Sequence, residues 1–186
     1  MLPEHKNRDK LVDEVVFLEG MISNLLLSDK LSIPYTNVQN DRVKVSNLLI
    51  KVIDLVNVSL EKFNVQNEIP QEYVIIDETK MIIALRNLID NALKYGSSDH
   101  PIVIHVFQKN NIFIVEVKNR GDKIQERDGE DIFLPFFRST NNKNRVSGFG
   151  LGLTICKKIA EAHGGKLLMT STDQETNFSI EIPIKK

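Results

Sequence analysis

Apolar residues recur at helical spacing near the N-terminus of the chain, over residues 8–31. The seam residues, spaced alternately four and three apart, are Leu11, Val15, Leu18, Ile22 and Leu25. Such spacing is typical of helices that pair along their length. The neighbouring Val12, Val16, Met21 and Leu26 widen the apolar face, as in a helical bundle. One helix cannot bury this face alone, so we expect it to form a homodimer; packing against its own domain is the alternative.

The middle of the chain alternates between short strands and an amphipathic helix. Ser32-Ile33-Pro34 ends the first helix, and residues 35–42 are predicted to be a polar linker. Residues 43–45 are predicted as a short strand, and Ser46 as the N-cap of a helix that runs to about Phe63. Two short strands are then expected, around residues 65–69 and 73–76.

The next predicted helix carries a pair of asparagines. Asp77 can cap it, and no Gly or Pro interrupts it before Gly96. Its apolar stripe, formed by Leu85, Leu88, Ile89 and Ala92, is predicted to face a core. Asn87 and Asn91 are four residues apart, so both carboxamides project from one side, where Mg²⁺ accepts such oxygens. Lys94, about one turn further, can hold a phosphate as a point charge. A surface helix with two solvated asparagines is the alternative.

The C-terminal half is predicted to contain strands, a long loop and one more helix. Residues 101–108 and 112–118 are predicted to form a hairpin, and residues 119–147 are mostly polar apart from an aromatic cluster at residues 132–137. Such a long loop is usually functional or mobile. A helix should follow to His163, where Gly164-Gly165 stops it, before strands at residues 166–171 and 178–184. This order predicts one sheet with helices packed on one face.

Composition narrows the class of protein. The 186 residues, of which 41% are hydrophobic, suffice for one domain plus an extra element. The net charge of −1 gives no basic field for nucleic acid. The lone Cys156 excludes an internal disulfide, and neither a signal peptide nor an apolar run of membrane-spanning length is present. We therefore expect a soluble, cytoplasmic chain.

Two further stretches suggest a ligand site. Gly148, Gly150 and Gly152 alternate before the last helix, so backbone N–H groups and the helix N-terminus can approach a polyphosphate. No Gly-Lys-Ser/Thr follows, and no strand of a βαβ unit precedes, so neither a Walker A loop nor a dinucleotide fingerprint fits. Asn119-Arg120-Gly121 ends a strand where a side chain can face a base. A flexible hinge and an ordinary turn are the respective alternatives.

Four motifs follow one another in a characteristic order. They are Asn-x-x-x-Asn-x-x-Lys-Tyr, a strand-ending x-x-Gly, Phe-x-Pro-Phe, and Gly-x-Gly-x-Gly-Leu with Ala-His-Gly-Gly after its helix. In this order they resemble the catalytic domain of sensor histidine kinases, within the superfamily of gyrase, Hsp90, histidine kinases and MutL. The resemblance covers about residues 43–184, and residues 21–28 resemble the end of the second helix of the kinases' dimerisation hairpin.

The resemblance implies a fold and a domain organisation. The fold would be α+β: a two-layer α/β sandwich of the Bergerat ATP-binding type, with a mixed sheet, helices on one face and one long N-terminal helix before it. Residues 1–34 would be the second helix of a dimerisation and phosphoacceptor hairpin, residues 35–42 a linker, and residues 43–186 the ATP-binding catalytic domain.

The resemblance also implies roles for individual residues, with ATP and Mg²⁺ as cofactors. Asn91 would be the main Mg²⁺ ligand with Asn87 beside it, and Asn87 and Lys94 would serve catalysis. The remaining nucleotide-binding positions would be Tyr95, Asn119, Gly121, Ile124, Gly148, Gly150, Leu151, Gly152, Leu153 and Thr176. Thr176 matches the Thr of a late Gly-Thr-x-Phe pattern, and residues 122–147 would form a mobile lid over ATP.

The chain departs from the family at several positions. Asn119 stands where the family has an adenine-reading Asp, and Lys123 where it has a second glycine. An Asn amide can pair with adenine, but without a charge-assisted bond. None of the four histidines, His5, His100, His105 and His163, lies in the family's His-Glu/Asp-x-x-Pro phosphoacceptor pattern. We therefore expect a C-terminal fragment of a longer kinase, which does not phosphorylate itself alone.

The sequence thus predicts the ATP-binding catalytic region of a sensor histidine kinase. It would transfer the γ-phosphoryl group to a histidine supplied elsewhere and then to an aspartate in the receiver domain of a response regulator. The full-length protein could carry a membrane anchor upstream of these residues. Two alternatives remain: an anti-sigma-factor-type Ser/Thr kinase, against which the heptad helix argues, and a degenerate, non-catalytic domain that acts through dimerisation and partner binding.

Overall fold

The computed structural model describes residues 38–125, 129–138 and 149–184, with residues 8, 11, 12, 14, 15, 18–20, 22, 23, 25 and 26 near the N-terminus. Its main sheet has five strands in the order β2-β4-β5-β7-β6. Their bounds are β2 Phe63–Glu68, β4 Ile102–Lys109, β5 Ile112–Asn119, β7 Thr176–Pro183 and β6 Lys166–Ser171. Only β2 and β4 pair in parallel, so the sheet is mixed.

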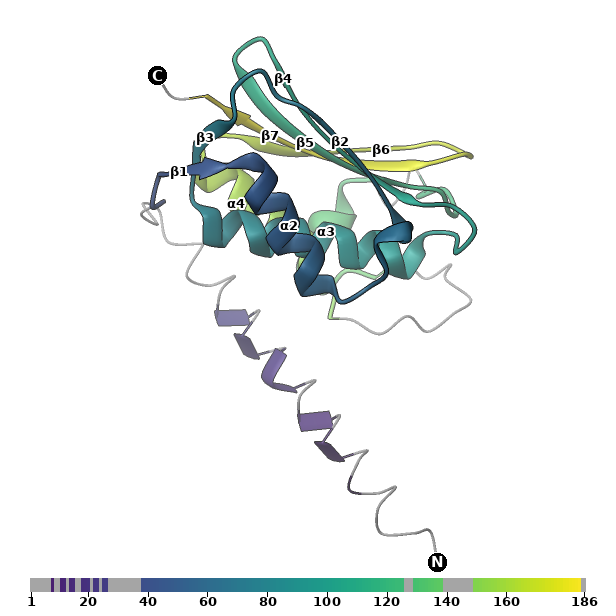
Figure 1. The fold of residues 1–186 in the computed structure, drawn as a ribbon. Helices are drawn as coiled ribbons and strands as arrows, with labels where there is room; N and C mark the ends of the chain where they lie inside the picture. Colours follow the sequence, from purple (N-terminus) through teal and green to yellow (C-terminus); the bar gives the residue numbers. More distant parts are fainter. Residues whose placement is uncertain are drawn as a thin grey trace, which may run out of the picture.

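Helices cover one face of this sheet. They are α2 Val45–Val56, α3 Glu78–Tyr95 and α4 Gly152–Ala162. In Figure 1 the three helices lie together on one side of the sheet, whose other face is open. This arrangement confirms the predicted two-layer α+β fold with a mixed sheet and helices on one face.

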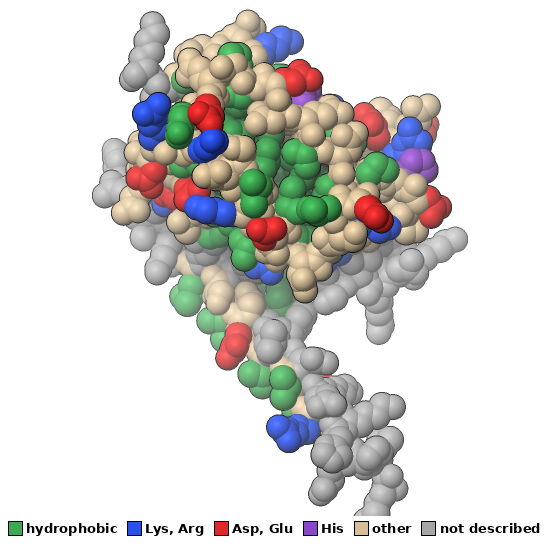
Figure 2. Space-filling view, in the orientation of Figure 1, with side chains coloured by type: hydrophobic (Ala, Val, Ile, Leu, Met, Phe, Trp, Pro, Cys, Tyr) green, Lys and Arg blue, Asp and Glu red, His purple; other side chains and the backbone are tan. Residues whose placement is uncertain are grey.

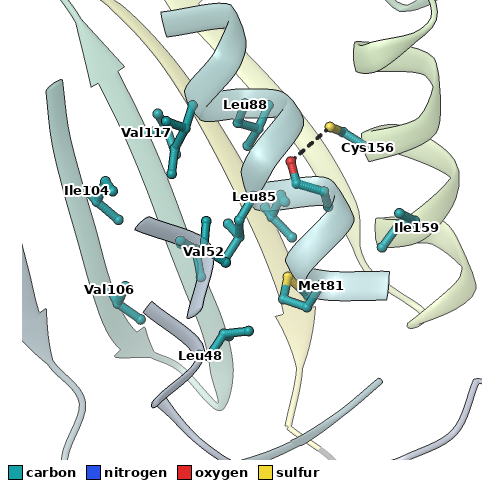
Figure 3. Packing of buried hydrophobic residues seen from close by; sticks show 14 of the residues in the cluster. Leu48, Val52, Met81, Leu85, Leu88, Ile104, Val106, Val117, Cys156 and Ile159 are labelled. Atoms are coloured by element: carbon teal, nitrogen blue, oxygen red, sulfur yellow. Dashed lines mark hydrogen bonds between the residues drawn. The ribbon is translucent and has the colours of Figure 1, made fainter. Parts of the chain in front are cut away.

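The core lies between the two layers. The inward residues of the sheet, among them Ile104, Val106 and Val117, are almost fully buried. Figure 3 shows them facing Leu48 and Val52 of α2 and Met81, Leu85 and Leu88 of α3. Cys156 of α4 donates its Sγ–H to the Ala84 carbonyl oxygen (3.3 Å), and complete burial raises the pKa of its thiol. The thiol therefore helps to hold α4 against α3, and it is not a reactive nucleophile.

The expectation of a single sheet is wrong. Strands β1 Asp41–Lys44 and β3 Tyr73–Ile76 form a separate two-stranded antiparallel sheet. β1 continues directly into α2, and β3 is separated from α3 only by Asp77. The two strands therefore pair at the ends of the helices they precede (Figure 1), and not beside β2.

Helix α2 also differs from its prediction at both ends. Ser46 is not its N-cap: Lys44 occupies that position without a side-chain bond, and the Val45 N–H donates to the Glu72 carbonyl oxygen (3.1 Å). Pairing across the small sheet therefore replaces a side-chain cap. The helix ends at Val56, well before Phe63, because Asn57 adopts a left-handed conformation (φ 53°), which Asn tolerates better than most residues.

The predicted seam of the N-terminal helix is not covered by the domain. The described residues between 8 and 26 are helical, and in Figure 1 they lead away from the domain. The exposed fraction of the seam side chains ranges from 48% at Leu25 to 61% at Leu11, and Figure 2 shows hydrophobic side chains along this segment. Among the described residues, no helix combines the length and apolar character needed to cross a bilayer.

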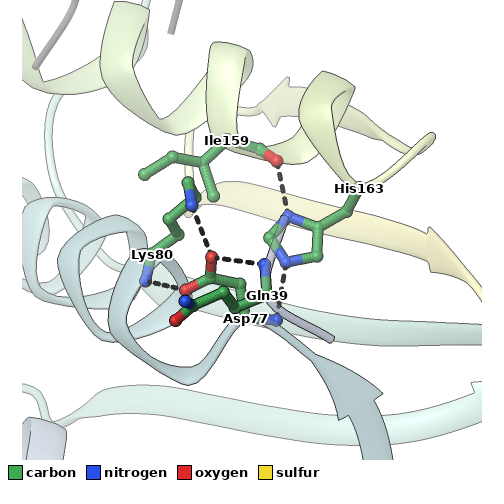
Figure 4. A network of polar contacts seen from close by, with 5 residues as sticks. All are labelled: Gln39, Asp77, Lys80, Ile159 and His163. Atoms are coloured by element: carbon green, nitrogen blue, oxygen red, sulfur yellow. Dashed lines mark hydrogen bonds and ion pairs between the residues drawn. The ribbon is translucent and has the colours of Figure 1, made fainter. Parts of the chain in front are cut away.

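A buried polar network joins α3 to α4 (Figure 4). Asp77 caps α3 as predicted, since its Oδ1 accepts from the Lys80 N–H (3.0 Å). Its Oδ2 accepts from the Gln39 N–H (3.1 Å) and pairs with the Lys80 ammonium group. The Asp77 N–H donates to His163 Nε2 (3.0 Å), and His163 Nδ1–H donates to the Ile159 carbonyl oxygen (2.7 Å). His163 is therefore neutral, with its proton on Nδ1.

Asp77 should give the domain an acid-sensitive part of its stability. Burial acts to raise the pKa of its carboxyl group, but the hydrogen bonds from Lys80 and the Gln39 N–H outweigh burial, and the pKa is lowered. A lowered pKa in the folded state means that this stabilisation is present above the unfolded-state pKa, about 3.9, and is lost as the pH falls through the folded-state value. At neutral pH, Asp77→Ala should reduce the free energy of unfolding by about 1–2 kcal/mol.

Urea unfolding of wild type and Asp77→Ala between neutral and acidic pH measures this effect. The difference between the two proteins should shrink at the acidic end. Asp99→Asn, in an exposed turn, is the control. A difference that stays constant down to the lowest pH would mean that the Asp77 carboxylate charge does not stabilise the fold.

Candidate functional site

Helix α3 presents the predicted ligand residues beside its core stripe and at its C-terminal end. The stripe itself is confirmed, because Met81, Ala84, Leu85, Leu88, Ile89 and Ala92 are buried. Asn87 and Asn91 are partly exposed, Lys94 is exposed, and Tyr95 is 41% exposed. These four side chains can therefore reach a ligand without disturbing the packing of the helix.

Asn87 lies beside the N-terminus of α4. A Cβ atom added to Gly152, the first residue of α4, would lie 3.7 Å from Asn87 Oδ1. No side chain caps α4, and the buried Asn87 Nδ2 has no hydrogen-bond partner among the described residues. An uncapped helix N-terminus offers free N–H groups and the positive end of the helix dipole. Together with the unpaired amide, it provides donors for an anion such as phosphate.

The glycine loop before α4 is held by the aromatic segment, residues 131–137. Gly150 is left-handed (φ 70°), and a Cβ atom there would lie 2.6 Å from the Phe137 carbonyl oxygen. The Phe136 N–H donates to the Gly150 carbonyl oxygen (2.9 Å), and Thr154 Oγ1–H donates to the Phe133 carbonyl oxygen (2.9 Å). Gly150 is thus required by chain packing. Gly148 lies outside the described residues.

The leucines of the glycine motif hold this loop in place. Leu151 is 2% exposed and belongs to the core, while Leu153 is half-buried against it. Their side chains therefore position the backbone of the loop. Their packing against the core does not by itself assign either leucine to a ligand.

A second group of predicted residues meets at the end of β5. Asn119 is buried and pairs in register with Thr176 of β7. Thr176 Oγ1 lies 2.8 Å from Ser171 Oγ, which accepts from the Ile124 N–H (3.0 Å). The structure therefore brings Asn119, Ile124 and Thr176 together, and adds Ser171. Lys123 stands where the family has a glycine, and its Nζ lies 3.7 Å from Asp173 Oδ1 at the surface.

Gly96 and Gly121 join the end of α3 to the end of β5. They form an isolated antiparallel bridge, and the Ser97 N–H donates to the Arg120 carbonyl oxygen (2.6 Å). A Cβ atom on Gly121 would lie 2.3 Å from the Tyr95 carbonyl oxygen. The glycine predicted to admit a base is thus needed for this contact with α3.

Only part of the predicted lid can be described. Residues 126–128 and 139–147 lie outside the described residues. Between them, η3 Asp131–Phe133 contributes Ile132 and Phe133, which pack partly against the core. Lys157 lies over the Phe133 ring, 5.8 Å from its centre. This part of the loop is therefore attached to α4.

Ser171 and Thr154 were not found by sequence reasoning. The short loop between β6 and β7 places Ser171 opposite Thr176, and this pairing could have been read from the two strands and the loop length. The bond from Thr154 to the loop at Phe133 spans residues with no sequence signal. Among the described residues, no cluster of His, Cys, Asp or Glu side chains is arranged to hold a metal ion.

Comparison with known proteins supports one family. Residues 76–186 match the family described as "Histidine kinase-, DNA gyrase B-, and HSP90-like ATPase". The adaptive-response sensory kinase SasA of Prochlorococcus marinus is 32% identical over 149 residues, which are 75% of this chain and 38% of that protein. The sensor protein kinase WalK of Staphylococcus saprophyticus is 30% identical over 169 residues, 88% of this chain and 28% of that protein. The chain thus spans well under half the length of these curated relatives.

Among solved structures, the catalytic domain of the histidine kinase ThkA has a similar fold. It superposes with a TM-score of 0.65 at 29% identity, and the match covers 78% of this chain and 95% of that domain. The similarity therefore includes nearly the whole of a catalytic domain.

The two described glycines of the motif should respond differently to substitution by alanine. Gly150→Ala should lower the melting temperature by several degrees, because the new Cβ meets backbone atoms and the left-handed conformation is strained, by about 1–3 kcal/mol. Gly152→Ala should leave the melting temperature nearly unchanged, since its Cβ makes only ordinary contacts, but it should weaken ATP binding beside Asn87. Thermal unfolding and ATP titration of both variants measure this. Equal melting temperatures of the two variants would contradict the assignment of Gly150 to chain packing and of Gly152 to the ligand site.

Proposed function

The chain belongs to the histidine kinase-, DNA gyrase B- and HSP90-like ATPase family, and on this premise we propose that it transfers the γ-phosphoryl group of Mg-ATP to a histidine. From that histidine the group would pass to an aspartate of a response regulator. The chain is the ATP-binding catalytic region of a sensor histidine kinase. The observation that carries the proposal is that the uncapped N-terminus of α4 lies beside the Asn87 amide, which has no hydrogen-bond partner among the described residues.

The phosphate end of the site lies between α3 and α4. The proposal gives Asn91 the main role in holding Mg²⁺, with Asn87 beside it, because neutral carboxamide oxygens suit this ion next to phosphate oxygens and waters. When bound, Mg²⁺ neutralises charge on the phosphates. Lys94 and the N–H groups at Gly150 and Gly152 would hold the phosphate oxygens, which is the positioning and charge stabilisation that phosphoryl transfer requires.

The base end of the site lies where β5 meets the end of α3. Asn119 and Thr176 would face the base, Gly121 and Ile124 would border it, and Tyr95 would line the nucleotide. The support is geometric: the Gly96–Gly121 bridge places this cluster at the C-terminal end of α3. Leu151 and Leu153 would act through the loop that they hold, and Gly148 would contribute a further N–H group.

The phosphoacceptor is proposed to lie outside the described residues. The His163 ring is buried, and each of its nitrogens makes a hydrogen bond. His105 lies on the open face of the sheet, 3.4 Å from both Glu68 and Glu116, and His100 contacts Arg120. None of these contacts involves a residue that is proposed to hold the phosphates.

The proposed domain organisation follows the predicted one. Residues 1–34 would be a hairpin helix that dimerises, residues 35–42 a linker, and residues 43–186 the ATP-binding domain. The exposed seam and the bond from Gln39 to Asp77 support this division, because the helix is left uncovered while the end of the linker is attached to the domain. The proposed partners are a second copy of the chain and a response-regulator receiver domain, and the proposed location is the cytoplasm.

Calorimetric titration with ATP, with and without Mg²⁺, tests the proposal. Wild type should bind ATP more tightly when Mg²⁺ is present. Asn91→Ala should lose this enhancement and keep its melting temperature, because Asn91 is partly exposed and does not belong to the buried stripe of α3. Asn64→Ala, on exposed β2, is the matched control. Binding of Mg-ATP by Asn91→Ala at wild-type affinity would refute the metal assignment, and no ATP binding at all would favour the non-catalytic alternative.

The N-terminal seam should cause weak self-association. Each seam residue contributes about 1.5–3 kcal/mol when fully buried. Association must offset the loss of translational and rotational freedom, about 4–15 kcal/mol. Since these sums are comparable, sedimentation should find monomer in dilute solution and dimer when concentrated. Leu18→Glu with Ile22→Glu should abolish the dimer without changing ATP affinity; unfolding of the domain by these substitutions would place the helix in its core.

A further inference from the structure

The base end of the site contains a carboxamide, that of Asn119, which forms no hydrogen bond with the described residues. Asn119 is only 7% exposed, and it ends β5 opposite Thr176. Its side chain makes no hydrogen bond with the part of the chain that the structure describes, and its oxygen and nitrogen are not among the completely buried polar atoms that lack a partner. Water or a ligand can therefore reach this carboxamide and make the hydrogen bonds that the protein does not make.

The position of Asn119 suits the base of a nucleotide. Asn87, at the phosphate end, is nine residues before Gly96, which corresponds to roughly 13 Å along α3 at 1.5 Å per residue. Asn119 adjoins Gly96, since its Cβ lies 3.3 Å from the position that a Gly96 Cβ would take. A nucleoside triphosphate can span this interval with its phosphates at Asn87 and its base at Asn119. The argument here rests on the proposed function.

A carboxamide differs from a carboxylate in the bases that it accepts. An ionised carboxylate only accepts hydrogen bonds, so it matches the amino group at position 6 of adenine and repels an oxo group there. A carboxamide has an acceptor and a donor, and a half-turn of its terminal torsion exchanges them. It therefore matches an amino group with its oxygen and an oxo group with its NH₂.

The surroundings leave Asn119 able to make that half-turn. Asn119 Nδ2 lies 3.3 Å from the position that a Gly121 Cβ would take, so the glycine leaves space for the amide. The neighbouring polar side chains, Thr176 and Ser171, are hydroxyls within 2.8 Å of each other, and either can donate to the other. Hydroxyls can also reverse their polarity, so these neighbours do not impose one orientation on the amide.

We infer that Asn119 makes this site accept purine nucleoside triphosphates that carry either an amino or an oxo group at position 6 of the base. The amide turns to match each group. Selection between nucleotides by the group at position 6 is therefore weak in this chain. A carboxylate at residue 119 would make that selection strong.

Competitive titration of the chain with ATP and with inosine triphosphate, both with Mg²⁺, tests the inference. The two ligands differ only in the group at position 6 and the proton on N1. Wild type should bind them with dissociation constants within about threefold of each other. Asn119→Asp should prefer ATP by about tenfold or more, since its carboxylate cannot donate to the oxo group. Asn64→Asp, with the same charge change on exposed β2, should keep the wild-type ratio.

Asn119→Ala guards against a folding defect in the Asp variant. It should lose affinity for both nucleotides to the same extent and keep their ratio near that of wild type. A wild-type preference for ATP of tenfold or more would overturn the inference while leaving the proposed function intact. Binding of neither nucleotide by wild type would overturn both.

Discussion

Helix α3 is buried along one face over its whole length, and this packing positions both ends of the site. Its core stripe contacts the sheet, and it packs against α2 and α4 on either side. Burial of a large apolar side chain contributes about 1.5–3 kcal/mol, so the rotation of α3 about its own axis is strongly determined. The four-residue spacing then keeps Asn87 and Asn91 on one side of the helix. A rotation large enough to bury Asn91 would expose Leu85 and Ile89 to water.

The two ends of the paired helices α3 and α4 differ in how their polar groups are satisfied. At one end, Asp77 and His163 accept and donate within the protein, and Gln39 and Lys80 complete the network. At the other end, Asn87 Nδ2 and the first N–H groups of α4 have no side-chain partner among the described residues. A fold can leave donors unpaired without loss only where a ligand or water satisfies them. The polar groups at one end thus hold the two helices together, whereas those at the other end remain available to a ligand.

Two other buried polar atoms without a hydrogen bond have a different setting. His105 Nε2 and Asn177 Oδ1 lie on the open face of the sheet. His105 is 3.4 Å from Glu68, and Asn177 already donates its amide to Glu116 (3.1 Å). Burial acts to raise the pKa of Glu116, but bonds from Lys118 and Asn177 outweigh it, and the pKa is lowered. These atoms belong to a charged network that is largely satisfied, unlike the amide of Asn87.

The sequence predicted α3, its cap at Asp77, the hairpin of β4 and β5 and the family, because each depends on local spacing or on motif order. It misplaced the end of α2, since Val56, Leu60 and Phe63 continue the helical period although Asn57 turns the chain. It also missed the small sheet of β1 and β3, because strand partners far apart in the chain are not encoded locally.

The glycines also show that contacts between distant parts of the chain cannot be read from local sequence. At Gly96, Gly121 and Gly150 a Cβ atom would lie 2.3, 2.3 and 2.6 Å from backbone oxygens, whereas at Gly152 it would make ordinary contact with Asn87. A backbone oxygen cannot rotate aside as a side chain can, so the first three glycines are required for chain packing. The chain segments that border the candidate site therefore owe their close approach to these glycines.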